Sequence, residues 1–537
     1  MQWQSADQLK ELLCELVSWE SETFSLGEKQ FPLRLREKFV SLPYFKGNPK
    51  HLQTIEVDQG RSFLSAFYQK EGITKTVVLI SHFDTVPTEE YGSLQYLATQ
   101  PELLTQAFAQ HPDLLNETAQ EDLAKGDYLF GRGVMDMKMG LALHMHLIEK
   151  AIEREWDTNL LLITVPDEEV NSAGMRGAVT HIAELKKELG LDIELFLNSE
   201  PSFSQDPTDL QEYIYTGSIG KIMPAALFYG KETHVGEPMK GLTASFMNSY
   251  LTAEMEFNRD FLETVYDEIT PLPVSLEQKD LKTHYSTQTP YRAYALYNVF
   301  LMKRTAEEIF SLFENTAKIA MAKCQSRYEE ACSAADVEAT AKIRTISYED
   351  LYQYSLQKQG STKVEEIIQH IMANDALDDR QKSIRIADQL MIYNQELAPA
   401  VVLLFAPPYY PPASSKDHQL VQELVHLLLE EGKKYDIPLN EKHYFNGICD
   451  LSYCQNATND GWQSYVHNSP VWQRSYEIPF EAMAAISAPV MNVGPFGKDA
   501  HQISERLHVK SAFIEMPVML TKVIEHINKK QLLHQNN

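Results

Sequence analysis

Two histidines and three carboxylates, each near the end of a different predicted element, form a candidate ligand set for metal ions. Their nitrogen and oxygen donors suit one or two Zn²⁺, Mn²⁺ or Co²⁺ ions. No cysteine accompanies them, which disfavours a structural zinc site. Two close ions would need a bridging carboxylate, which Asp136 could supply from a loop. The candidate ligands are His82, Asp136, Glu169, Glu200 and His501.

The neighbours of these residues add further chemistry. Asp84 lies two residues after His82, where a carboxylate can fix the tautomer of the imidazole. Glu168 and Glu169 are adjacent on a predicted bend, so their side chains can face different ways. One can bind a metal while the other holds a proton, as metal-assisted hydrolysis requires.

Alternating strands and helices should bring these side chains together. Apolar strands are predicted at 61–68, 76–82, 159–166 and 193–197, with helices at 5–20, 27–41, 137–154 and 172–189. Such alternation indicates an α/β fold whose central sheet is flanked by helices. Ligands of these sheets gather beyond the carboxyl ends of the strands, where His82, the Glu168–Glu169 pair and Glu200 are expected.

A different pattern begins near Thr216 and predicts an inserted α+β domain. Its expected elements are strands at 221–228 and 294–302, helices at 242–266 and 305–323, and a helical segment at 364–395. The apolar run at 400–405 would resume the first domain. We therefore expect a first domain formed by 1–215 and 398–537, interrupted by an insert at 216–397.

Composition narrows the class of protein and its partners. The 537 residues include 48 basic and 75 acidic side chains, a formal net charge of -27, which argues against nucleic acid and anionic membranes as partners. No apolar run approaches the ~20 residues of a membrane helix. Five scattered cysteines are typical of reduced thiols, so we expect a cytoplasmic protein.

Five short motifs carry a family resemblance. They are Ser81–Pro87, Gly131–Lys138, Asp167–Glu169, Ser199–Ser202, and Gly494-Pro495 followed by Ala500-His501. In this order they resemble the two-metal exopeptidase family of aminoacylases, glutamate carboxypeptidases and succinyl-diaminopimelate desuccinylases. Within that family the chain looks most like the bacterial arginine-utilisation branch.

The resemblance implies a zinc-exopeptidase-like catalytic domain that holds two divalent ions, Zn²⁺ first and Mn²⁺ or Co²⁺ as alternatives. His82, Asp136 and Glu200 would hold one ion. Asp136 would bridge to the second ion, which Glu169 and His501 would complete.

The resemblance also implies roles in catalysis. Asp84 would orient His82, and Glu168 would be the general base that activates a water for attack on an amide carbonyl. The segment 230–244 has the spacing of the family's lid-domain motif, in which His234 would stabilise the oxyanion. Because that histidine often reaches a partner subunit's site, a homodimer through the insert follows as a hypothesis.

Substrate contacts are less well defined. The segment 87–131 is longer than the family pattern, and Thr243 occupies a position where asparagine is common. The strand at 294–302 lacks an arginine where the family often clamps a substrate carboxylate. The substrate-binding candidates are Arg292, Lys303, Arg304 and Asp450.

Each residue taken alone also has an ordinary structural interpretation. A single histidine at a strand end is a metal ligand in roughly one case in five. Glu168 and Glu169 alone would be a solvated start of a helix, Asp84 a turn residue and His234 a loop residue. The functional interpretation rests on the joint order and type of the motifs.

We therefore predict a metal-dependent hydrolase that cleaves an amide bond in a small N-acyl amino acid or short peptide, in arginine or ornithine catabolism. One alternative is an aminopeptidase or dipeptidase on the same scaffold. A second is a non-catalytic metal-binding regulatory protein, against which the presence of Glu168 argues.

Overall fold

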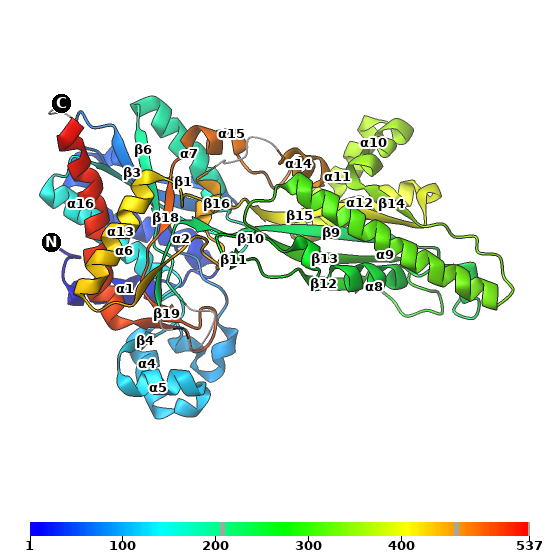
Figure 1. Cartoon of the computed structure of the whole chain (residues 1–537), viewed down its shortest axis with the longest axis horizontal. Coiled ribbons are helices and arrows are strands. Elements are labelled where there is room, and N and C mark those ends of the chain that lie inside the picture. Colours follow the sequence, from blue (N-terminus) through cyan, green and yellow to red (C-terminus); the bar gives the residue numbers. More distant parts are fainter. Residues whose placement is uncertain (204–208, 210, 456–460, 535–537) are drawn as a thin grey trace. The chain divides into compact units, whose positions relative to one another are not determined.

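The computed structural model describes residues 1–203, 209, 211–455 and 461–534 and divides into two compact units (Figure 1). The first unit comprises Met1–Ser218, Ala413–Ala457 and Pro479–Asn537, and the second comprises Ile219–Pro412 and Thr458–Ile478. Each unit has its own main sheet.

An eight-stranded sheet forms the centre of the first unit. Its strands, in spatial order, are β1 (Leu52–Asp58), β2 (Arg61–Tyr68), β5 (Asn159–Val165), β3 (Lys75–His82), β6 (Asp192–Asn198), β18 (Val490–Asn492), β7 (Glu212–Tyr215) and β17 (Leu439–Lys442). Strand β3 runs parallel to both β5 and β6. Their carboxyl ends therefore meet at one edge of the sheet, as predicted for the ligand-bearing loops.

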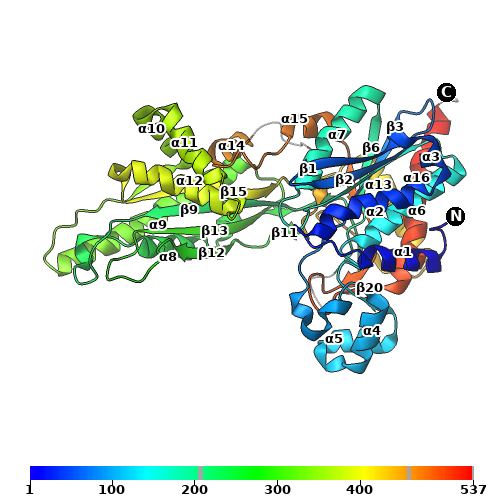
Figure 2. The same cartoon turned by 180° about the vertical axis from the view of Figure 1, so that it is seen from behind.

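Helices cover both faces of this sheet because its central strands are apolar throughout. One set shares a continuous hydrophobic core with the strands: α1 (Ala6–Ser18), α2 (Leu26–Val40), α6 (Lys138–Arg154), α13 (Gln419–Lys434) and α16 (Met516–His534). Helix α7 (Ala173–Leu189) packs on β1, β2 and β5. Figure 2 shows α7 on the opposite side of β1 and β2 from α2. Helix α15 (Phe480–Ile486) packs against α7.

A helical insertion between β3 and β4 (Tyr128–Phe130) forms a small lobe of the first unit (Figure 1). It contains the 3₁₀ segment η2 (Glu89–Leu97) and helices α4 (Pro101–Gln110) and α5 (Glu117–Lys125). Strand β4 completes a three-stranded sheet with β19 (Gly497–Lys498) and β20 (Arg506–His508). The long segment 87–131 of the sequence thus has a core of its own.

The second unit is built on a five-stranded sheet. The strands, in spatial order, are β12 (Val274–Asp280), β13 (Arg292–Leu301), β9 (Gly220–Tyr229), β15 (Ala400–Tyr410) and β14 (Arg344–Ser347). Helices α8 (Ala244–Met255) and α9 (Ala306–Ala334) pack on it and on each other, and α12 (Asp379–Tyr393) packs on β15 and β9. Further helices of this unit are α10 (Tyr348–Gln359), α11 (Ser361–Met372) and α14 (Gln463–Asn468).

Two expectations about the insert were wrong. The run at 400–405 does not resume the first domain, because β15 pairs with β9 and β14 of the second sheet, and the chain returns to the first unit only at Ala413. The helix expected at 242–266 ends at Met255, since Phe257 adopts a left-handed backbone conformation (φ 55°) that no α-helix continues.

Within the described part of the chain, no helix is both long and apolar enough to span a membrane.

Candidate metal centre

His82 is the last residue of β3, and its ring is held by the turn that follows. Its Nδ1 lies 3.0 Å from the main-chain oxygen of Asp84 and 3.5 Å from the carboxylate of the same residue. An N–H on Nδ1 donated to that carbonyl leaves the lone pair on Nε2. The ring is buried and presents Nε2 to the carboxylates of Asp136, at 3.1 Å, and Glu200, at 3.4 Å.

Asp136 lies between the two histidines. Its Oδ1 is 3.1 Å from His82 Nε2 and its Oδ2 is 3.1 Å from His501 Nε2. Glu169 Oε1 is also 3.1 Å from His501 Nε2. Two groups of potential ligand atoms therefore share Asp136, and within each group the atoms lie within 4.8 Å of one another: His82, Asp136 and Glu200, and Asp136, Glu169 and His501.

The bend that carries Glu168 and Glu169 is fixed by hydrogen bonds to Asp84. Oδ1 of Asp84 accepts the backbone amide of Glu168 at 3.0 Å, and Oδ2 accepts that of Glu169 at 3.3 Å. The hydroxyl of Thr23 donates to the same Oδ2 at 2.9 Å. Glu169 thus turns toward His501, while Glu168 Oε2 lies 3.8 Å from His82 Nε2 and belongs to neither ligand group.

A buried cluster of charged side chains supports this bend, and it was not predicted from the sequence. Asp167 has a left-handed backbone conformation (φ 67°), and its carboxylate receives Arg61 Nη1 at 2.6 Å. Glu28 accepts the backbone amide of Asp167 at 3.0 Å and lies 3.6 Å from the same guanidinium nitrogen. Arg61 is more than a hundred residues from Asp167, so only the motif position of Asp167 gave any signal.

The charge balance of the site favours a cation. Burial alone would lower the pKa of His82, but the carboxylates around it, led by Glu200 and Asp136, raise that pKa well above its usual value. Burial likewise opposes charge on His501, yet hydrogen bonds to Asp136 and Glu169 raise its pKa to about 11. Protons on the histidines would thus partly neutralise a buried excess of carboxylates, and a divalent ion bound at Nε2 would take their place.

Two of the carboxylates also have raised pKa values, so they too favour the protonated form. Burial raises the pKa of Glu168 and of Glu200 well above the ordinary value, with His82 opposing the shift and neighbouring carboxylates adding to it. Divalent ions would supply the missing positive charge, and the donor set of imidazole nitrogens and carboxylate oxygens is one that Zn²⁺ and Mn²⁺ accept. The residues present therefore fit a pair of divalent ions.

Asp450 also belongs to the first unit, where it is an electrostatic neighbour of the candidate metal centre. It begins the 3₁₀ segment η7 (Asp450–Tyr453) and its side chain is 2% exposed. Burial raises its pKa to about 7, with a hydrogen bond from Ser172 and the charge of His82 opposing the shift. Its charge in turn raises the pKa of Glu168 and Glu200, so Asp450 is an acidic neighbour of the candidate centre.

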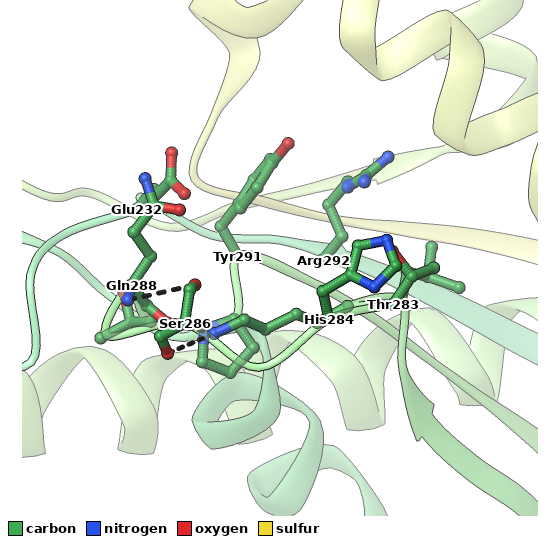
Figure 3. Close-up of a pocket in the computed structure, with 11 residues that line it drawn as sticks. Glu232, Thr283, His284, Ser286, Gln288, Tyr291 and Arg292 are labelled. Atoms are coloured by element: carbon green, nitrogen blue, oxygen red, sulfur yellow. Dashed lines mark hydrogen bonds between the residues drawn. The ribbon is translucent and has the colours of Figure 1, made fainter.

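The other sequence candidates belong to the second unit. His234 is exposed in the loop between β9 and α8 and pairs with Gln288 through an isolated β-bridge. Arg292, the first residue of β13, donates to Asp388 at 3.0 Å and lines a pocket of about 360 Å³ together with Tyr291 (Figure 3). His234 and Arg292 therefore lie at the same end of this sheet.

Lys303 and Arg304 are at the opposite end of β13. Their backbone amides both donate to the carboxylate of Glu263, at 2.9 and 3.1 Å. The strand between them and Arg292 has ten residues, which at the usual rise spans roughly 30 Å. The three cations do not form one cluster, and Lys303 and Arg304 lie away from the His234 loop.

The loop before Asp136 is supported by a second buried ion pair. Arg132 Nη1 donates to Glu505 Oε2 at 2.5 Å, and Glu505 Oε1 accepts the backbone amide of Gly133 at 2.8 Å. Arg132 also contacts Glu90 of the helical insertion. No signal in the sequence pointed to this pair, because Arg132 and Glu505 lie 373 positions apart in the chain.

Comparison with known proteins gives matches over most of this chain. The model of peptidase family M20/M25/M40 matches residues 78–461. The uncharacterized protein YqjN of Bacillus subtilis (strain 168) is 39% identical over 537 residues, covering 99% of this chain and 98% of that protein. Protein RocB of the same organism is 30% identical over 543 residues, covering 97% and 95%.

A solved structure has the same fold. The M20 family metallo-carboxypeptidase Sso-CP2 from Sulfolobus solfataricus superimposes with a TM-score of 0.55 at 12% identity, covering 97% of this chain and 99% of that one. At this identity the likeness concerns the fold. It confirms the predicted α/β class with a central sheet flanked by helices.

Proposed function

The chain belongs to peptidase family M20/M25/M40 and is a hydrolase, and from that premise we propose that it uses two divalent ions to cleave an amide bond in a small N-acyl amino acid or short peptide. One observation carries this proposal: the two oxygens of Asp136 each lie 3.1 Å from a different histidine. A shared carboxylate of this kind suits paired ions, Zn²⁺ ahead of Mn²⁺ or Co²⁺.

In this proposal the five candidate ligands hold the ions: His82 and Glu200 on one side of Asp136, Glu169 and His501 on the other. Bound there, divalent ions would supply Lewis acidity to the scissile carbonyl and to a water molecule. His82 fits this role because its Nδ1 already bonds to the main-chain oxygen of Asp84, which leaves Nε2 facing the site.

Glu168 is the proposed general base. Its carboxylate takes a proton from the attacking water while the water oxygen bonds to the carbonyl carbon, and it gives that proton to the nitrogen as the carbon–nitrogen bond breaks. The position of Glu168 supports this role, because it lies beside His82 yet outside both ligand groups. Asp84 fixes its backbone, so the carboxylate is aimed before substrate arrives.

The substrate is proposed to be an arginine or ornithine derivative. This rests on the resemblance of the motifs to the arginine-utilisation branch, and the buried carboxylate of Asp450 near Glu168 is compatible with a cationic substrate. Preference for free N-terminal amines over acylated ones would instead favour an aminopeptidase or dipeptidase.

The two units are assigned different tasks. We assign the chemistry to the first unit, which contains all five candidate ligands, and lid and dimerisation roles to the second, which carries His234. We further propose that the protein acts as a homodimer in the cytoplasm, consistent with its five unpaired cysteines. Light scattering tests the dimer: a strictly monomeric, fully active protein would exclude a role for His234 in a partner's site.

The decisive experiment compares the zinc-loaded native protein with Glu168→Gln on N-acyl-arginines, N-acyl-ornithines and dipeptides. Amine release should fall about 10²- to 10⁴-fold in the variant, with unchanged zinc content. Glu188→Gln, an exposed change on α7, should match the native protein. Equal turnover by native protein and Glu168→Gln would refute the proposed base. Bound zinc with no turnover on any substrate would favour the non-catalytic metal-binding protein.

A further inference from the structure

The loop that carries His501 needs external support to hold its conformation. It spans 499–505, between β19 and β20. Asp499 (φ 57°) and His501 (φ 63°) both occupy the left-handed region, which is uncommon for residues other than glycine. The His501 side chain is 45% exposed, and its ion-pair distances are to Asp136 and Glu169. The direction of the His501 side chain therefore depends on what fixes the rest of the loop.

The helical insertion at 89–125 packs directly on this loop. Its own hydrophobic cluster consists of Tyr91, Leu94, Leu97, Ala98, Leu104, Phe108, Leu115 and Ala119, together with Phe130 of β4. Ile503, two residues after His501, packs against that cluster. The hydroxyl of Tyr91 also donates to the main-chain oxygen of Gln502 at 3.5 Å. The insertion thus gives the 499–505 loop an apolar surface to pack against.

A single carboxylate of the insertion holds both residues that flank the loop. Asp122, on α5, is 3% exposed. Its Oδ2 accepts Lys498 Nζ at 2.7 Å and Arg506 Nε at 2.9 Å. Lys498 immediately precedes the loop and Arg506 immediately follows it. Burial would raise the pKa of Asp122, but the hydrogen bonds from these two cations lower it, so the carboxylate is ionised at neutral pH.

The same network continues into the loop. Arg506 Nη1 donates to Asp499 Oδ2 at 2.5 Å and to the main-chain oxygen of Ser504 at 3.0 Å. Asn116, which caps α5, donates to Asp499 at 3.3 Å and to the Ser504 hydroxyl at 3.4 Å. Removing Asp122 would take away the carboxylate that Lys498 and Arg506 share, and with it the link between the two ends of the loop.

We propose that Asp122 is a positioning residue, which clamps Lys498 and Arg506 so that the 499–505 loop keeps His501 aimed at Asp136 and Glu169. The insertion would in this way preassemble one of the two ligand groups and leave the group of His82 and Glu200 untouched. This inference rests on the proposed function, because it concerns the metal affinity of that group.

The test measures zinc binding by the full-length protein, using calorimetric titration with a competing chelator, for the native chain, Asp122→Asn and His501→Ala. In Asp122→Asn one zinc should bind about 10- to 100-fold more weakly and the other as in the native protein. A matched control is Lys125→Ala, since Lys125 is 58% exposed and lies 3.5 Å from the other oxygen of Asp122. Both zinc affinities should be native in this control.

The outcomes separate the two hypotheses. If His501→Ala loses one zinc while Asp122→Asn binds both with native affinity, the positioning role is wrong and the proposed ligand set stands. If His501→Ala keeps both zinc ions at native affinity, the ligand assignment fails, and this inference fails with it. Should Asp122→Asn not fold, Asn116→Ala decides: a few-fold weakening of one site supports the clamp, and native affinity at both sites overturns it.

Discussion

The carboxylate of Asp84 accepts the backbone amide of Glu168 at 3.0 Å, so the residue expected to orient His82 also fixes the proposed base. In Asp84→Asn one carboxylate oxygen becomes an NH₂ group that cannot accept an amide. We expect kcat to fall roughly 10- to 100-fold, measured as amine release by the zinc-loaded protein. Thr23→Val, which removes only the hydroxyl donor to the same carboxylate, should cost a few-fold at most. Native kcat in Asp84→Asn would show that the hydrogen bond does not matter.

Arg61 contributes to stability as the counter-ion of a buried cluster. It lies 2.6 Å from Asp167 and 3.6 Å from Glu28, and both carboxylates are fully buried. Arg61→Met would leave two buried carboxylates without their counter-ion, so the free energy of unfolding should fall by about 3–5 kcal/mol in urea titrations. The control is Asp58→Asn, since Asp58 is the partly exposed partner of Arg61 and should cost only about 1 kcal/mol. A loss of equal size in both variants would contradict this account.

Local patterns account for most of the predicted framework. The strand at 61–68 has the same bounds as β2, and the helix at 137–154 starts one residue before α6, because continuous apolar runs and helical periodicity are properties of neighbouring residues. Strand β1 was missed, since its residues are only partly buried at the edge of the sheet. Strand β15 was assigned to the wrong unit, because an apolar run does not encode which strand it pairs with.

The same reasoning applies to the site. Its five candidate ligands follow strand ends or lie in loops with distinctive motifs, and the structure brings them together. The residues that support them were not predicted: Arg61 pairs with a residue 106 positions away, and Arg132 with one 373 positions away. Such pairs lie within reach only after folding, and a single sequence carries no periodic signal for them.

Glu212 should make stability depend on pH. This β7 side chain is 5% exposed, and burial, with Glu515 adding to the effect, raises its pKa from 4.5 to about 7, while a hydrogen bond from Ser511 opposes the shift. Between these two values the folded state keeps a proton that the unfolded state has lost, so stability falls as pH rises and the full cost is present above pH 7.

The expected result for Glu212→Gln follows from this fall of stability with rising pH. The variant should match the native protein near pH 4.5 and become more stable than it by on the order of 3 kcal/mol at pH 8, measured by urea unfolding across this range. Glu56→Gln, on an exposed position of β1, should show no such trend. A stability difference that is constant with pH would show that folding does not raise the pKa of Glu212.

Gly494 should be required for the placement of Glu200. A Cβ at this position would lie 2.1 Å from the main-chain oxygen of Glu200 and 2.6 Å from that of Ser199, distances that no side chain occupies without moving backbone. In Gly494→Ala the overpacking should lower the free energy of unfolding by about 1–3 kcal/mol and shift Glu200 away from His82. Zinc titration should then show weaker binding at one site. Gly47→Ala is the matched control, because a Cβ there meets nothing within 4 Å. Native zinc affinities in a folded Gly494→Ala protein would show that Glu200 tolerates the shift or does not bind the ion.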